Sequence, residues 1–382
     1  MSESRGFVPP PYPYDRLDEL RAVAGTLPGG AVDLSIGTPC DPPPGIVVEA
    51  LARSGAERGY PPSIGTAAFR EAAAGWLGRR FGVTVDPGAV AACIGTKELV
   101  AGVPQWLRLR APARDTVLYP EISYPTYEMG AILAGCRAVP YARPEEIPVA
   151  EAERALCLWV NSPANPTGEV TDLAAAAAWG RRHGVPVLSD ECYIEFTWDG
   201  PGRTILSEGV DGVVALHSLS KRSNLAGARV GFYAGDPELV RYLSEVRKHA
   251  GFMVPGPVQA AATVALGDDA HVEAQRERYL RRLDRLAAAL TAAGVPSHRP
   301  PATFYLWVAA PGGDAWALAS RLAAEAGTVV SPGEFYGEAG AGHVRIAVVQ
   351  PDERLDLVVE RLEGAAATAR GRSRHPVRGS AG

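Results

Sequence analysis

The chain has 382 residues, a formal net charge of −5 and an apolar fraction of 47%, so it can build one large or two ordinary domains with a substantial core. The mildly acidic balance argues against a nucleic-acid-binding protein, and no apolar run approaches the roughly 20 residues of a membrane span. The N-terminus lacks the apolar core of a signal peptide. Five scattered cysteines without a CxxC pair favour reduced thiols in the cytoplasm over a disulfide framework or a metal site.

The predicted elements begin with a Pro-rich arm and a short helix in residues 1–30. Residues 89–96 predict a strand that ends in a glycine turn, and residues 97–107 predict a helix that is broken or kinked at Pro104. Further helices are expected at residues 127–136 and 173–184, and further strands at residues 115–120, 137–142, 155–163, 185–193, 213–221 and 228–235. Apolar strands with helices between them favour a mostly parallel α/β sheet that is covered on both faces.

A second pattern begins beyond residue 265, where a long amphipathic helix is predicted at residues 271–294 and strands at 304–310 and 343–349. This pattern favours a second, smaller α+β domain. We therefore expect an N-terminal arm with part of the small domain at 1–35, a large domain at 36–265, a small C-terminal domain at 266–368 and a disordered tail at 369–382.

Polar turns follow four of the predicted strands, and ligands of open parallel sheets bind beyond the carboxyl ends of the strands. The first turn, Gly95-Thr96-Lys97, opens a helix whose free amides can bind an anion, although Thr96 can equally be a plain N-cap. The second turn, NSPANPTGE at residues 161–169, is by itself compatible with an ordinary loop. The third is SDECY, residues 189–193, where Asp190 ends a buried strand; a buried carboxylate is costly unless it is paired with a cation or a strong donor, and the plain alternative is an internal salt bridge.

The fourth turn lies in HSLSKRSNLAGARVGF, residues 217–232, and holds one of only three lysines in the chain. Ser218, Ser220 and Arg229 offer the hydroxyls and the forked cation that suit a phosphate. Lys221 follows a buried strand, where desolvation would lower its pKa and make it a candidate amine nucleophile; the alternative is a simple phosphate clamp. Together the four turns meet the needs of pyridoxal 5′-phosphate (PLP), namely a Schiff-base lysine, a carboxylate for the pyridine nitrogen and a phosphate cup.

The ordered series GTK, YPTY, NPTG, DECY and SLSK, followed by two arginines, resembles the fold type I PLP-dependent aminotransferases over nearly the whole chain. That resemblance implies an α/β fold, with a mostly parallel seven-stranded sheet in the large domain and a smaller α+β domain. It implies that Lys221 binds the cofactor and later transfers a proton, because arginine stays protonated and cannot form the imine. It also implies that Asp190 pairs with the pyridine nitrogen, and that Asn165 and Tyr193 donate to the ring hydroxyl oxygen.

The same resemblance implies the remaining contacts. Tyr124 would stack on the cofactor ring, and Arg345 would bind the substrate α-carboxylate. Gly37 would close over the substrate, which Asn165 would also contact. A tyrosine of a neighbouring subunit would reach the phosphate, which implies a homodimer with shared sites. The residues implied for the phosphate are Thr96, Lys97, Ser218, Ser220, Arg229 and, from the neighbouring subunit, Tyr60.

Longer strings such as DLSIGTPCDPPP, PEISYPTYEMGA and HSLSKRSNLAGARVGF closely resemble the actinobacterial type of N-succinyldiaminopimelate aminotransferase. This resemblance implies amino transfer between glutamate and N-succinyl-2-amino-6-oxopimelate, in lysine and diaminopimelate synthesis. The acceptor carries several carboxylates. Arg345 would take one, and Arg222, Lys97 or Lys248 are candidates for a distal one because they lie beside the motifs.

Other functions on the same scaffold stay open at this point. The main enzymatic alternatives are an aminotransferase for another amino acid and a PLP-dependent carbon–sulfur lyase. A PLP-binding transcription regulator would need an N-terminal DNA-binding module, for which the short segment before the predicted cofactor domain leaves no room. A scaffold or adaptor without enzymatic activity is disfavoured by the combination of Lys221, Asp190 and Arg229.

Overall fold

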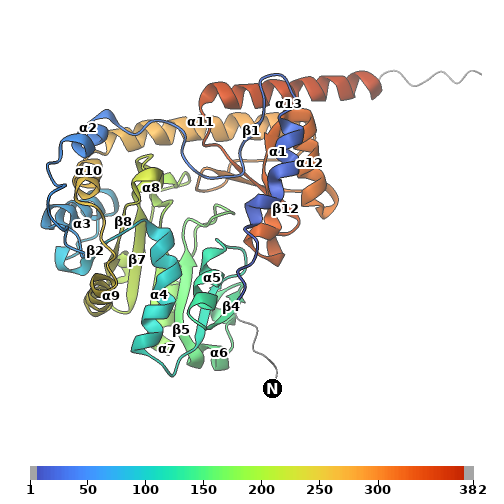
Figure 1. The fold of residues 1–382 in the computed structure, drawn as a ribbon. Coiled ribbons are helices and arrows are strands. Elements are labelled where there is room, and N and C mark those ends of the chain that lie inside the picture. The colour runs from blue at the N-terminus through green and yellow to red at the C-terminus, as the bar shows by residue number, and fades with distance from the viewer. Residues whose placement is uncertain (1–6, 374–382) are drawn as a thin grey trace, which may run out of the picture.

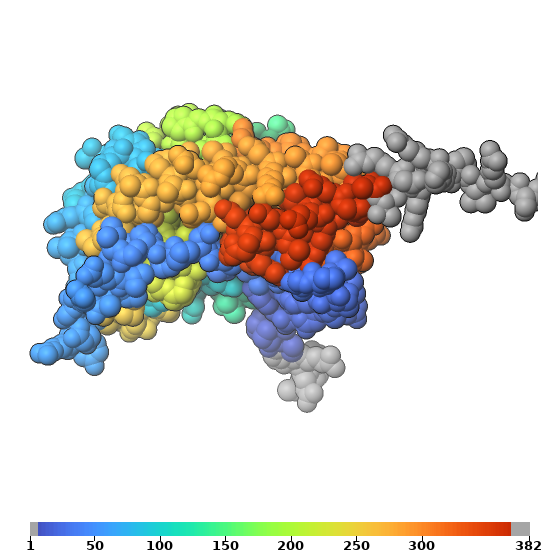
Figure 2. All heavy atoms as spheres, turned by 90° about the horizontal axis from the view of Figure 1, so that it is seen from above, coloured from blue at the N-terminus to red at the C-terminus, as the bar shows by residue number. Residues whose placement is uncertain are grey.

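The computed structural model describes residues 7–373, with the side chains of residues 7–367. A large domain built on a central sheet lies beside a smaller one, and the long helix α11 (Ala270–Ala292) runs from one to the other (Figure 1). Figure 2 shows this helix, in gold and orange, packed alongside the C-terminal helix α13 (Asp352–Ser373). None of the helices within residues 7–373 combines the length and the apolar character that a membrane crossing needs.

The large domain is organised around a seven-stranded sheet in which one strand is reversed. β8 runs antiparallel to both of its neighbours, and the other neighbouring pairs are parallel. The mostly parallel seven-stranded sheet implied by the resemblance is therefore confirmed. In spatial order the strands are β2 (Val90–Cys93), β8 (Gly231–Gly235), β7 (Val213–Ser218), β6 (Val187–Asp190), β5 (Ala155–Asn161), β3 (Thr116–Pro120) and β4 (Arg137–Tyr141).

Both faces of this sheet are buried, as the uninterrupted apolar strands predict. Alternate residues of β7 illustrate this, because Val213 and Ala215 pack into one apolar cluster whereas Val214 and Leu216 pack into another. The helices of the large domain are α2 (Gly45–Arg53), α3 (Ala67–Phe81), α4 (Thr96–Arg110), α5 (Thr126–Leu133), α6 (Val149–Arg154), α7 (Leu173–His183), α8 (Leu219–Arg222), α9 (Pro237–His249) and α10 (Gly256–Gly267).

Two of these helices bear on predictions made from glycine and proline. α7 ends at His183, and Gly184 follows in the left-handed conformation with φ 60°, as expected of a C-cap glycine. The sequence predicts a helix that is broken or kinked at Pro104; α4 continues through this proline, so the break is wrong, and the kink stays a prediction. The helix tolerates one missing backbone donor because its neighbouring turns are held in the core by buried side chains such as Val100 and Trp106.

The small domain combines residues from both ends of the chain. Its apolar cluster joins Leu17 and Leu20 to Leu283 of α11 and Val358 of α13. Its other elements are β1 (Val32–Asp33), β9 (Tyr305–Ala309), β10 (Thr328–Val329), β11 (Ser331–Pro332), β12 (His343–Ala347), α1 (Asp18–Ala24) and α12 (Ala315–Ala326). α13 extends to Ser373, so the first residues of the tail that we predicted to be disordered are helical; residues 374–382 lie outside the described part of the chain.

The segment between β1 and α2 is fixed to α11 by a buried ion pair. Asp41 accepts hydrogen bonds from Arg282 at 2.7 and 2.9 Å and from Gln275 at 2.9 Å. Both charged side chains are nearly inaccessible to solvent, so removing Arg282 would leave the Asp41 carboxylate buried without this cation, whereas Arg282 also pairs with Asp352 at 2.5 Å. This contact anchors the segment that contains Gly37. Gly37 itself lies near the carboxyl ends of the large sheet.

Candidate active site

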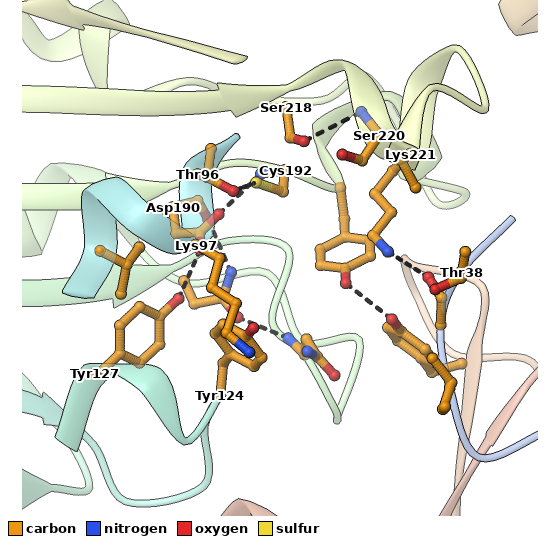
Figure 3. Close-up of a pocket in the computed structure, with 18 of the residues that line it drawn as sticks. Thr38, Thr96, Lys97, Tyr124, Tyr127, Asp190, Cys192, Ser218, Ser220 and Lys221 are labelled. Atoms are coloured by element: carbon orange, nitrogen blue, oxygen red, sulfur yellow. Dashed lines mark hydrogen bonds between the residues drawn. The ribbon is translucent and has the colours of Figure 1, made fainter. Parts of the chain in front are cut away.

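A cavity of about 270 Å³ lies at the carboxyl ends of the parallel strands and is lined by residues of both domains. All of the residues predicted for the cofactor and the α-carboxylate except Tyr60 line it. They come from the turns after β2, β3, β5, β6 and β7, from the segment after β1, and from β12 in the small domain. Figure 3 shows several of these side chains around the same space. The parallel sheet therefore brings residues that are far apart in sequence to one cavity.

Asp190 ends β6, and its buried carboxylate lines the cavity. Oδ2 accepts a hydrogen bond from the Tyr127 hydroxyl at 2.9 Å, and Oδ1 accepts one from the backbone amide of Cys192 at 3.2 Å. Burial raises the pKa of Asp190, and these donors oppose the rise. Within the described residues Asp190 forms no ion pair, so the internal salt bridge considered from the sequence is not made. The carboxylate can instead meet a cationic group of a ligand.

Lys221 lies in α8, directly after β7, and its ammonium donates a hydrogen bond to the carbonyl oxygen of Gly37. Burial lowers the pKa of Lys221 to about 8, as its position after a buried strand predicted. The positive charges of Arg345 and Arg229 act in the same direction. A substantial fraction of the amine is therefore neutral near pH 8, which is the form that attacks a carbonyl carbon.

The N-terminus of α4 forms an anion-binding part of the cavity, where Gly95 is the N-cap. A methyl group at Gly95 would lie 2.4 Å from Arg229 Nη2, so only glycine lets this guanidinium approach the helix terminus. Arg229 has the left-handed backbone conformation (φ 56°, ψ 58°), which is unfavourable for arginine and is typically kept for function. The polar side chains that line the cavity nearby are Thr96, Ser218 and Ser220. Amides, hydroxyls and a forked cation together suit a phosphate.

Arg345 of β12 is a buried cation, 3% exposed, that forms no ion pair within the described residues. Nη1 donates to Asn165 Oδ1 at 2.8 Å, and Nη2 donates to the carbonyl oxygen of Ser35 at 2.5 Å. Nε has no hydrogen-bond partner among the described residues. The guanidinium carbon lies 4.2 Å from the centre of the Tyr305 ring. A buried guanidinium that lacks an anion is suited to bind the carboxylate of a ligand.

The residues of the cavity fit PLP. The buried carboxylate of Asp190 lacks the cation that a protonated pyridine nitrogen would supply. The Gly95 turn and Arg229 offer a site for the phosphate, and Lys221 offers an amine of lowered pKa for the aldehyde. Tyr124 also lines the cavity, and its ring can cover a flat aromatic ligand.

Sequence reasoning missed several residues of the cavity. Tyr127 donates to Asp190, and the hydroxyl oxygen of Tyr305 lies 2.9 Å from that of Tyr193. Tyr127 could have been found, because it belongs to the same YPTY string as Tyr124 and lies in the first turn of α5, directly after it. No local signal marks Tyr305. The other lining residues that were not predicted are Tyr12, Tyr14, Ile36, Thr38, Val100, Asn161, Cys192 and Ala226.

Two predicted contacts are not made within one chain. Tyr60 is 98% exposed and lies outside the cavity, in the segment after α2 that projects from the body in Figure 2. Arg222 is buried away from the cavity, with its Nε 3.4 Å from Glu195 Oε1. The hypothesis that Arg222 binds a distal substrate carboxylate is therefore wrong. Of the other two candidates for that role, Lys248 lies outside the cavity and Lys97 lines it.

Comparison with known proteins identifies relatives over nearly the whole chain. The family model described as aminotransferase class I and II matches residues 30–362. The chain is 46% identical to the 4-dedimethylamino-4-oxo-anhydrotetracycline transaminase OxyQ of Streptomyces rimosus, over 92% of this chain and 99% of that protein. It is 35% identical to an LL-diaminopimelate aminotransferase of Desulforudis audaxviator, over 93% and 95% of the two chains. Its structure resembles that of a probable N-succinyldiaminopimelate aminotransferase from Thermus thermophilus, with 33% identity and a TM-score of 0.82, over 92% and 99%.

We expect Lys221→Met to stabilise the cofactor-free protein at pH 7. The wild-type chain buries a protonated amine whose pKa is about 8, against roughly 10.4 when unfolded, at a cost on the order of 1–3 kcal/mol that methionine avoids. This cost is fully present below pH 8. It is lost as the pH rises from about 8 to roughly 10.4, so the stability advantage of the variant should shrink over that pH range. Urea unfolding at neutral and alkaline pH measures the difference.

Lys248→Met is the matched control for this prediction, because Lys248 lies on the surface with its side chain 61% exposed. Its unfolding free energy should follow that of the wild type at every pH. If Lys221→Met and wild type unfold at the same urea concentration at pH 7, the burial of the Lys221 ammonium carries no such cost.

Proposed function

Because the chain belongs to the class I and II aminotransferase family, we propose that it interconverts N-succinyl-LL-2,6-diaminopimelate and 2-oxoglutarate with N-succinyl-2-amino-6-oxopimelate and L-glutamate. Members of the family depend on PLP, and the protein is a PLP-dependent aminotransferase. The observation that carries the proposal is the buried Arg345, a cation without an ion-pair partner among the described residues, in the same cavity as the amine of Lys221. Amino acids and keto acids carry a carboxylate beside the reacting carbon, which this arrangement accommodates.

Bound PLP supplies an electron-withdrawing ring that stabilises negative charge at the substrate α-carbon. We assign Asp190 to hold a proton on the pyridine nitrogen, which its buried carboxylate favours. Asn165 and Tyr193 are assigned to donate to the ring oxygen, and Tyr124 to cover one face of the ring. The turn at Gly95 is assigned to the phosphate, together with the residues named for that part of the cavity.

Lys221 Nζ is assigned as the base that takes the proton from the substrate α-carbon. A base must be neutral to accept a proton, and the pKa of about 8 keeps part of the Lys221 amine neutral near physiological pH. The Gly37 carbonyl oxygen accepts a hydrogen bond from this amine and holds it in the cavity. Arg345 fixes the carboxylate of the substrate, so that the α-carbon is presented to the amine in one orientation.

Lys97 is our candidate for the distal carboxylate of the substrates. It lines the cavity and forms no ion pair within the described residues. Its ammonium lies 5.4 Å from the centre of the Tyr12 ring and 5.9 Å from that of the Tyr124 ring. Aromatic rings hold a cation without neutralising it, so Lys97 keeps its full charge for an anion. Glutamate, 2-oxoglutarate and the succinylated substrates all carry a carboxylate beyond the one assigned to Arg345.

A second candidate reaction is amination of a ketone on a fused-ring molecule. The identity of 46% to OxyQ, whose name describes action on an anhydrotetracycline, favours it. The cavity also offers aromatic side chains on which flat rings could stack, including Tyr12, Tyr14 and Tyr124. The two candidates differ in charge, because only the succinylated acceptor needs the cation of Lys97.

We also propose a homodimer in which Tyr60 of each subunit completes the phosphate site of the other. The exposure of Tyr60 supports this, and so do the exposed apolar residues Ile46, Val48 and Leu51 on the nearby helix α2, since apolar surface of this kind marks interfaces. A cytoplasmic location is part of the proposal, and it is supported by the five cysteines, none of which forms a disulfide.

A half-reaction with the PLP-loaded protein tests the function. L-glutamate in single turnover should remove the visible absorbance of the bound cofactor, and N-succinyl-2-amino-6-oxopimelate should restore it. If a fused-ring ketone restores the absorbance and the succinylated keto acid does not, the second candidate replaces the first. A wild-type band that does not respond to glutamate, alanine or aspartate would contradict amino transfer to these substrates altogether.

We expect Lys97→Met to lower the preference for dicarboxylic substrates. The ratio of kcat/KM for L-glutamate to that for L-alanine should fall by about tenfold or more, because loss of one charge-assisted contact costs on the order of 1.5–3 kcal/mol. Lys248→Met is the matched control and should keep the wild-type ratio, since Lys248 lies outside the cavity. An unchanged ratio in Lys97→Met would remove this lysine from substrate recognition.

Mixing two defective subunits tests the shared site. Lys221→Ala and Tyr60→Ala proteins should each have little activity alone. If each site uses Tyr60 from the other subunit, a mixed dimer contains one intact site, so re-equilibrated mixtures should recover up to about a quarter of wild-type activity. Mixtures no more active than their components, or a wild-type protein that is monomeric by light scattering, would contradict the shared site.

A further inference from the structure

Tyr305 of β9 reaches three residues of the proposed site from the small domain. Its hydroxyl oxygen lies 2.9 Å from that of Tyr193, and its ring centre lies 4.2 Å from the guanidinium carbon of Arg345. The third residue is Gly37. A methyl group at this position would lie only 1.9 Å from the Tyr305 hydroxyl, so the backbone of Gly37 packs directly against Tyr305. Arg345 pairs with Trp307 across the antiparallel strands β12 and β9, so Tyr305, two residues away, shares the face of Arg345.

The two phenols have one proton each to donate, and the direction of the hydrogen bond between them matters. If Tyr193 donates to Tyr305, its proton is not available for the oxygen of the cofactor ring. If Tyr305 donates to Tyr193, that proton is free. Burial raises the pKa of both phenols, and the charge of Arg345 opposes both rises. It is the strongest opposing cause for Tyr305, whose ring centre lies 4.2 Å from the guanidinium carbon, which favours Tyr305 as the donor. Donation from Tyr305 also polarises Tyr193 and strengthens it as a donor in turn.

The ring of Tyr305 has a separate effect on Arg345. The guanidinium carbon lies close to two tyrosine rings, 4.2 Å from the centre of Tyr305 and 4.8 Å from that of Tyr336. A guanidinium recognises a carboxylate through two parallel hydrogen bonds in its own plane, so its orientation decides whether both bonds can form. The rings limit rotation of that plane and stabilise the charge while it lacks an anion.

We propose that Tyr305 is a positioning residue that couples the two halves of the active site. Its hydroxyl turns the Tyr193 proton towards the cofactor, and its ring fixes the plane of Arg345 for the substrate carboxylate. The inference rests on the proposed roles of Tyr193 and Arg345. A carboxylate bound to Arg345 neutralises the charge that makes Tyr305 a good donor, so binding of the substrate weakens the hydrogen bond that reaches the cofactor.

Two variants separate the hydroxyl from the ring. In the PLP-loaded protein, Tyr305→Phe should raise the pH midpoint at which the visible band titrates by about half a unit or more, because a weaker Tyr193 donor stabilises less negative charge on the ring oxygen. Its KM for L-glutamate should change by less than about threefold, since the ring remains. Tyr305→Leu should shift the midpoint similarly and raise the KM by about tenfold, because the ring is lost.

Tyr279→Phe is the matched control, because Tyr279 is a buried tyrosine of α11 beside Phe304 that does not line the cavity. It should keep the wild-type midpoint and KM. Equal midpoints in Tyr305→Phe and Tyr279→Phe, or equal KM values in the two Tyr305 variants, would overturn the coupling. A wild-type band that titrates but does not respond to glutamate would instead overturn the proposed function, and the midpoints would still decide the role of the hydroxyl.

Discussion

Parallel hydrogen bonding between β5, β6 and β7 is the constraint on which the active site depends. The register places Asn161 beside Asp190 at the carboxyl ends of β5 and β6. The Asn161 side chain then donates to the Asp190 carbonyl oxygen at 2.8 Å and accepts from the Asn165 amide at 2.8 Å, so one amide group joins two of the site's turns. A slip of β6 by one residue would turn the Asp190 carboxylate to the opposite face of the sheet and out of the cavity.

The charges of the cavity differ from the other buried charges of the protein. Arg282 is neutralised by Asp41, and Arg222 lies beside Glu195, so these ions gain Coulomb energy that offsets part of their desolvation. Asp190 and Arg345 are equally buried, yet within the described residues their partners are neutral donors and acceptors. The folded chain carries this cost until ligands of opposite charge arrive. Binding of PLP and of a carboxylate therefore stabilises the fold as well as preparing the reaction.

How much the sequence predicts depends on how local the signal is. The sheet and the residues at strand ends follow from apolar runs and the turns after them, which is why Asp190 and Lys221 were found. Arg222 was assigned wrongly because adjacent residues of a helix point in different directions, and α8 directs its arginine to Glu195 rather than to the cavity. Tyr305 was missed because its contacts join segments more than a hundred residues apart. The reversed direction of β8 leaves no trace in its apolar pattern.

One backbone segment holds the side chains of both Lys221 and Arg345. The carbonyl oxygen of Gly37 accepts from Lys221, and that of Ser35 accepts from Arg345. These carbonyl oxygens accept hydrogen bonds from donors that would otherwise be buried without partners. Because the carbonyls are neutral, they leave the positive charges available for an anion. They are also weaker acceptors than a carboxylate, so a substrate can displace them. Asp41 anchors the same segment to α11, the helix that runs from one domain to the other. The position of this segment therefore depends on α11, and movement of the helix would change the contacts of Lys221 and Arg345 at once.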